Sequence, residues 1–158
     1  MKAGAIIALT TVGVAAAAGI SYYAWARNQL DFKIGGVDFS PPVNGALTVK
    51  VKFLIKNGTG ISFTVTSMQC NIFLNNQFIG IAGLAQQVLI PGNSTIPIEV
   101  VIQLKASDAT KFAFNYALGF LGGSRAASNF IIDGVSKARI NTWLPITVNY
   151  PVNETYSL

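Results

Sequence analysis

The chain has 158 residues, of which 51% are hydrophobic and only 11% are charged, and its mean hydropathy is +0.49. This composition excludes an intrinsically disordered protein and favours a membrane-associated or heavily buried one, with room for one folded domain. The formal net charge is +5. The single cysteine, Cys70, excludes an internal disulfide, and the lack of histidine removes the usual metal ligand and general base.

The segment from Ala3 to Ala26 contains 24 residues without a charge. As a helix it would measure about 36 Å, enough to cross a hydrocarbon core of about 30 Å. An aromatic group and the next charge follow at its end, where ring side chains favour the headgroup layer: Tyr22, Tyr23, Trp25 and Arg27. We therefore expect residues 1–29 to form a transmembrane signal-anchor in a lipid bilayer.

A cleavable secretory signal peptide is the competing interpretation of this segment. Met1-Lys2 is a short basic start, and Ala24-Trp25-Ala26 fits the small-x-small cleavage pattern. We expect the segment to be retained, which makes the chain a single-pass membrane protein. A signal-anchor start favours a C-terminal domain outside the cytoplasm, or a place in a viral membrane.

Small residues recur four positions apart in the same segment, a spacing that lets two helix backbones approach closely in lipid. The pairs are Gly4 with Ala8, Gly13 with Ala17, and Ala15 with Gly19. This pattern indicates contact with other membrane helices or protein subunits, although Gly and Ala are also common in membrane helices without a partner.

Residues 30–152 are expected to form a mainly β domain, an immunoglobulin-like antiparallel β-sandwich with one helix. Apolar and polar residues alternate most clearly over 47–56, and further strands are expected at 62–75, 78–84, 94–104, 129–140 and 143–150. Pro97 predicts either an edge position for its strand or a strand start, because proline has no amide hydrogen for a central ladder.

Turn residues separate these strands, at 41–45, at 57–60 and at Asn75-Asn76. Between the strands, Ser107-Asp108 can cap a helix of about fourteen residues that Gly122-Gly123 ends. Residues 153–158 are expected to form a short polar, mobile tail.

Lys50, Lys52 and Lys56 fall on alternate positions of the strand at 47–56 and form a possible basic surface. No aromatic residues are interleaved with them to stack on bases, so we expect a solvated strand face and no nucleic-acid partner.

The six acids show no local spacing of a catalytic pair, and the chain lacks a nucleophile elbow, a phosphate-binding glycine loop and a Cys-x-x-Cys motif. We therefore expect no enzyme, no cofactor, no metal and no small-molecule substrate. Asn57, Asn93 and Asn153 begin triplets that fit N-glycosylation acceptors, although such residues are also common in turns.

Three stretches resemble the late embryogenesis abundant (LEA) type 2 proteins and their water stress and hypersensitive response (WHy) domain. They are a strand ending in Asn (51–57), a hairpin carrying a Gly (71–80), and an Ile-Pro-Gly turn before a long alternating strand (90–98). Residues 131–135 and 144–146 look like the closing strand pair. Lys56-Asn57-Gly58 departs from the Asn-Pro-Asn often found in the family. The resemblance implies an immunoglobulin-like sandwich, frequently membrane-anchored, without a known active site.

Two functions are consistent with these features. The first is a structural or interaction component of a membrane-associated assembly, such as a cell-envelope complex or a membrane-containing virion. The alternative is a stress-protective or lipid-interacting module of the LEA type 2 kind.

Overall fold

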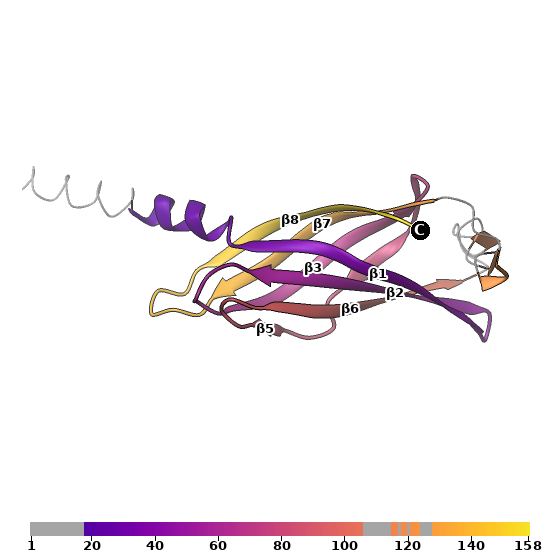
Figure 1. Ribbon diagram of the computed structural model, residues 1–158, viewed down its shortest axis with the longest axis horizontal. Coiled ribbons are helices and arrows are strands. Elements are labelled where there is room, and N and C mark those ends of the chain that lie inside the picture. The colour runs from indigo at the N-terminus through magenta and orange to yellow at the C-terminus, as the bar shows by residue number, and fades with distance from the viewer. Residues whose placement is uncertain (1–17, 106–114, 117, 120, 124–127) are drawn as a thin grey trace, which may run out of the picture.

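Two antiparallel sheets make up the domain in the computed structural model, which describes residues 18–105, 115–116, 118–119, 121–123 and 128–158 (Figure 1). One sheet has the strand order β1-β2-β6, and the other has the order β4-β3-β7-β8 with β5 paired to β3. The strands of the described residues are β1 (Leu30–Val43), β2 (Ala46–Asn57), β3 (Phe63–Leu74), β4 (Gln77–Gly83), β5 (Val88–Ile90), β6 (Thr95–Lys105), β7 (Asn129–Ile140) and β8 (Thr147–Ser157). The mainly β, antiparallel sandwich predicted from the sequence is confirmed.

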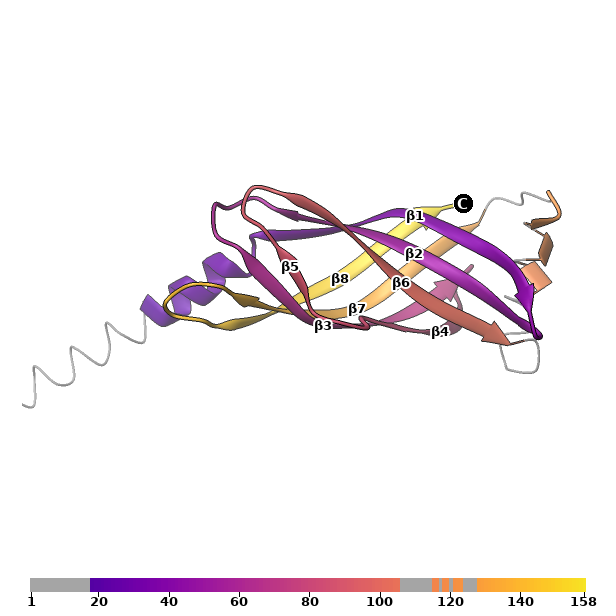
Figure 2. The same ribbon diagram turned by 90° about the horizontal axis from the view of Figure 1, so that it is seen from below.

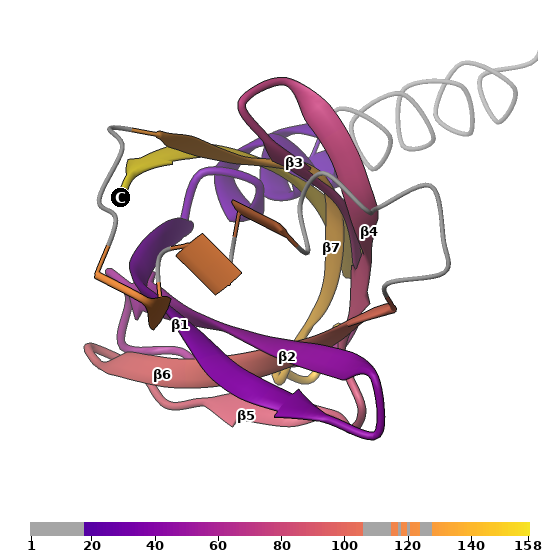
Figure 3. The same cartoon turned by 90° about the vertical axis from the view of Figure 1, so that its right-hand side faces the viewer.

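The two sheets curve around a single hydrophobic core, as the view along the long axis shows (Figure 3). β4 lies beside β6, and β1 lies beside β8, so each margin of one sheet approaches a margin of the other. The approach is tight at Gly80, where a Cβ atom would lie 3.1 Å from Cγ2 of Ile102. β6 is an edge strand of its sheet, which confirms the position predicted for Pro97.

The alternation of apolar and polar residues over 47–56 corresponds to the two faces of strand β2. Its five apolar residues on one face are completely buried, while the lysines between them are exposed. Because the sheet of β2 is one layer of a two-sheet sandwich, one face packs on the core and the other faces water.

Strand β1 was not among the strands predicted individually, because its alternation changes phase. Leu30 and Phe32, at even positions, are buried before Gly35-Gly36, whereas Val37 and Phe39, at odd positions, are buried after it. A register shift between Ile34 and Gly36 inserts an extra residue against β2. A search for period-two alternation in the sequence therefore finds two short fragments where the structure has one strand.

Asparagines at positive φ make the turns predicted at 41–45 and at Asn75-Asn76. Asn44 and Gly45 have φ values of 52° and 76°, and Asn75 and Asn76 have values of 48° and 65°. Two successive residues at positive φ match the right-handed twist of the strands that they join. The first turn is thus confined to Asn44-Gly45, and Pro41-Pro42 belong to the edge strand β1.

The C-terminal boundary differs from the prediction. Strand β8 begins at Thr147 instead of 143 and continues to Ser157, paired with β7 along its length. Residues 153–157, expected to be a mobile tail, therefore belong to the sheet, and the amide of Leu158 donates a hydrogen bond to the carbonyl of Ser128 at 2.9 Å. Their polar side chains suit an edge strand whose outer face is in water.

A helix of residues 18–26 extends from one end of the sandwich (Figures 1 and 2). No helix within the described part of the chain is long and apolar enough to cross a membrane. Most of the predicted membrane segment, including Gly4, Gly13 and Ala17, lies outside the described residues, as does the start of the predicted helix at Ser107-Asp108. Helical residues do occur within that second prediction, at 115–116, 118–119 and 121.

Candidate functional site

The N-terminal helix joins the sandwich without a linker. The amide of Arg27 donates to the carbonyl of Tyr23 at 3.0 Å, and β1 begins three residues later. The side-chain amides of Asn28 and Gln29 donate to the helix carbonyls of Ala24 and Trp25, at 3.3 Å and 2.9 Å. These bonds satisfy carbonyl groups that the last helical turn leaves free, so the helix ends where the sheet starts.

Ala26 and Tyr150 fasten the helix to the core. Ala26 is 0% exposed, and the Tyr150 hydroxyl donates a hydrogen bond to its carbonyl oxygen at 2.6 Å. The Tyr150 ring packs on Phe32 with a centroid separation of 5.8 Å. Burial, with a smaller contribution from Tyr23, raises the pKa of Tyr150, so the phenol stays a neutral donor.

The same helix contacts the loop between β7 and β8, residues 141–146. The hydroxyls of Tyr22 and Thr142 are 3.1 Å apart. Figures 1 and 2 both place this loop beside the helix, at the end of the sandwich from which the helix leaves. A hollow of about 450 Å³ lies between them. Its lining is mainly apolar: Ala18, Gly19, Tyr22, Ile61, Thr142, Trp143 and Leu144.

Trp143 is the most exposed aromatic residue of this group, with 92% of its surface accessible, and Leu144 beside it is 45% exposed. We call the described helix together with residues 58–62, 91–94 and 141–146 the helix end. An exposed Trp-Leu pair at a loop tip is unusual because large apolar side chains normally pack. The helix end is therefore the strongest candidate for an interaction site.

Asn57 holds two other loops of the helix end in place. Its side-chain amide donates to the carbonyls of Ile61 at 2.7 Å and Pro91 at 2.9 Å, and its Oδ1 accepts from the amide and hydroxyl of Thr59, both at 3.0 Å. Asn57 is only 1% exposed, so its triplet is not a glycosylation acceptor in the folded chain. This asparagine, which the LEA resemblance highlighted, positions Ile61 in the hollow.

The residues predicted at the membrane interface lie together on this helix. Tyr22 is half-buried and stacks on Trp25, with ring centroids 5.8 Å apart and planes at 16°. Tyr23, Trp25, Arg27 and Gly19 are exposed. The sequence prediction missed Ile61, Thr142, Trp143 and Leu144, which reach the site from other loops. A sequence signal for the last two was available, because the apolar pair Trp143-Leu144 stands between the turn-forming residues Asn141 and Pro145.

The three lysines of the predicted basic surface share one exposed face, but acidic residues lie on the same face. Lys50, Lys52 and Lys56 are all exposed along β2. In the strand register, Lys50 lies opposite Asp38, Lys52 opposite Glu99 and Lys56 opposite Asp31. Directly opposed unlike charges reduce the net field of this face.

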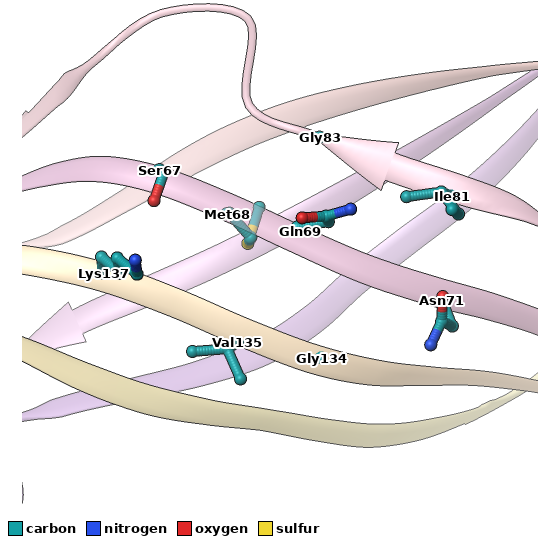
Figure 4. Close-up of a pocket in the computed structure, with 9 residues that line it drawn as sticks. All are labelled: Ser67, Met68, Gln69, Asn71, Ile81, Gly83, Gly134, Val135 and Lys137. Carbon is teal, nitrogen blue, oxygen red and sulfur yellow. The ribbon is translucent and has the colours of Figure 1, made fainter.

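A second hollow, of about 560 Å³, lies on the outer side of the larger sheet (Figure 4). Its lining comes from β3, β4 and β7, where Gly83 and Gly134 flank β3 without side chains. The nearby thiol of Cys70 faces the core, and burial, aided by the charge of Asp133, raises its pKa to about 11. Such a thiol is a packing group, because it is rarely present as the reactive thiolate.

Comparison with known proteins identifies the fold. No family model and no curated protein matches the chain. The solution structure of AT1g01470 from Arabidopsis thaliana is similar, with 11% identity, 80% of each chain covered and a TM-score of 0.50. A crystal structure of a protein from Archaeoglobus fulgidus has 9% identity over 81% of this chain and 95% of that one, with a TM-score of 0.44. At2g46140.1, described as a late embryogenesis abundant protein, has 10% identity over 98% of this chain and 86% of that one, with a TM-score of 0.37. At these identities the likeness is one of fold alone, that of a β-sandwich.

Proposed function

We propose that this chain is a non-enzymatic, lipid-interacting module of the LEA type 2 kind, whose N-terminal segment holds the sandwich against a bilayer. The observation that carries the proposal is the joint at Ala26, where the helix is built into the core of the sandwich instead of hanging from a flexible linker. Such a joint fixes the position of the sandwich relative to the segment.

The joint supports retention of the segment. Cleavage after Ala26, at the small-x-small pattern, would remove a completely buried residue and leave the Tyr150 hydroxyl in the core without its acceptor. Leaving a buried polar group without a partner costs about 1–3 kcal/mol. Because Ala26 contributes to the core, we expect the domain to be more stable when the segment stays attached.

The length of the uncharged run supports anchoring. From Ala3 to Tyr22 it would measure about 30 Å as a helix, which matches the hydrocarbon thickness of a bilayer. The headgroup layer would then lie at Tyr22, Tyr23 and Trp25, which is where such rings are favoured.

A non-enzymatic role agrees with the placement of the acids. In the described chain, no three side chains of the metal-ligating types gather. Asp31 is 3.5 Å from the Lys33 ammonium group, and Asp133 lies between Asn71 and Asn153 in the register of the larger sheet. Neither of these two carboxylates lies opposite a second acid in the strand register.

The fold likeness favours the LEA-type module over the other expected function. A structural subunit of a cell-envelope complex or a virion has no support among the similar structures. Partner helices and other subunits therefore do not form part of the proposal.

Drying of vesicles tests the function. The full chain is reconstituted into vesicles that contain an entrapped dye, and flotation in high salt confirms that it is embedded. After drying and rehydration, we expect less dye release than from vesicles that carry the same mass of an inert membrane-anchored protein. Equal release would refute a protective role, and failure to float with the vesicles would refute the anchor.

A further inference from the structure

We infer that the β7–β8 loop is a second membrane contact, in which Trp143 and Leu144 enter the headgroup layer of the same bilayer and the surrounding cations favour anionic lipid. The inference rests on the proposed function and adds to it a contact residue and a class of lipid.

Hydrogen bonds hold the backbone of the loop on both sides of Trp143. The Asn141 side-chain amide donates to the Thr64 hydroxyl at 2.9 Å, and its backbone amide donates to the carbonyl of Ser62 at 3.0 Å. At the tip, the Thr142 hydroxyl donates to the carbonyl of Leu144 at 3.0 Å. A loop held by such bonds loses little conformational freedom when it binds, which favours binding.

The height of the loop matches that of the headgroup layer. Thr142 meets Tyr22 at 3.1 Å, so the tip of the loop lies beside the helix at the aromatic residues (Figures 1 and 2). If the uncharged run spans the hydrocarbon core up to Tyr22, the Trp143 ring lies in the interfacial layer, where the apolar body and the indole N–H of tryptophan are both accommodated.

The charges that flank the helix end fit an anionic surface. The helix end itself has no charged residue, but on the adjoining parts of the described strands and at Arg27 the cations outnumber the acids: Arg27, Lys33, Lys52, Lys56, Lys137 and Arg139 against Asp31 and Glu99. Lys137 and Arg139 lie on β7 just before the loop and are both exposed. Asp133 and Glu154 lie toward the opposite end of the same two strands. Basic residues close to a bilayer are attracted to anionic headgroups. The placement of cations near the helix end, with acids toward the opposite end, therefore favours an orientation in which the helix end faces the lipid.

Tryptophan fluorescence of the full chain tests the inference, because Trp25 and Trp143 are the two tryptophans of the sequence. Trp25→Phe leaves Trp143 as the probe, and Trp143→Phe leaves Trp25 as a probe of anchoring. The matched control adds Phe78→Trp to both changes, since Phe78 is 51% exposed on β4 beside the Asn75-Asn76 turn, at the other end of the sandwich.

Each protein is placed in phosphatidylcholine vesicles with or without phosphatidylserine. Quenching is measured with lipids brominated near the headgroup and with iodide in the water. We expect brominated lipid to quench Trp25 and Trp143, with a shift of the Trp143 emission to shorter wavelength, and iodide to quench the control. Phosphatidylserine should increase the quenching of Trp143, and Lys137→Gln with Arg139→Gln should remove that increase.

The outcomes separate the inference from the proposed function. Quenching of Trp25 but not of Trp143 by brominated lipid would overturn the second contact and leave the anchor intact. Quenching of neither would overturn both. Shielding of Trp143 from both quenchers would place a protein on the loop, and equal quenching in both lipid mixtures would overturn the preference for anionic lipid.

Discussion

Replacing Asn57 with alanine tests whether this buried amide organises the loops of the helix end. The change removes two hydrogen bonds donated to the carbonyls of Ile61 and Pro91 and two accepted from Thr59, at distances between 2.7 and 3.0 Å. At about 1 kcal/mol net for each bond, and with the Thr59 hydroxyl still able to reach the Ile61 carbonyl, we expect a loss of about 3 kcal/mol in the free energy of unfolding. Domains have about 5–15 kcal/mol in total, so this loss is large.

Urea unfolding of the full chain in mild detergent, followed by tryptophan fluorescence, measures the loss. Asn153→Ala is the matched control, because Asn153 begins the same type of triplet but is exposed on β8, and it should change stability by less than about 0.5 kcal/mol. Asn57→Asp should destabilise at least as much as Asn57→Ala, because it sets a carboxylate oxygen against two carbonyl oxygens. Similar losses for Asn57→Ala and Asn153→Ala, or a tolerated Asn57→Asp, would refute the assigned hydrogen bonds.

Three further predictions concern the core. Tyr150→Phe should cost about 1 kcal/mol in the free energy of unfolding because it removes the hydrogen bond to Ala26. Because burial raises the pKa of Tyr150, the wild type should keep this stability below about pH 10 and lose it above. Urea midpoints measured against pH should therefore decline less at alkaline pH for the variant than for the wild type. Gly134→Ala should cost more than about 2 kcal/mol because its Cβ atom would lie 2.2 Å from a backbone oxygen of β3, whereas Gly36→Ala has open space and should be neutral; equal urea midpoints would contradict this packing. The Cys70 thiol, with its pKa raised to about 11, should react with a thiol reagent at pH 8 only as fast as the chain unfolds, and rapid labelling of the native protein would show that it is accessible.

Local patterns accounted for much of the fold. The alternation over 47–56 predicted β2, and Asn75-Asn76 and Asn44-Gly45 placed two turns, because side-chain period and positive φ depend on neighbouring residues. Strand β1 escaped individual prediction because its bulge is defined only against β2. The end of β8 was misplaced because a polar edge strand has the composition of a tail until its pairing with β7 is known.

The candidate site was predicted only in its helical half. Tyr22, Tyr23 and Trp25 could be assigned to an interface from their position after an uncharged run, a property of consecutive residues. Their neighbours could not, because Thr142 is 120 positions from Tyr22 and Tyr150 is 124 positions from Ala26. Contacts at such separations follow from the closing of two sheets around one core, and no local period records them. A hydrophobic run and a set of strands can thus be recognised from the order of residues, whereas the joint between them, and the exposure of Trp143 beside it, arise from packing.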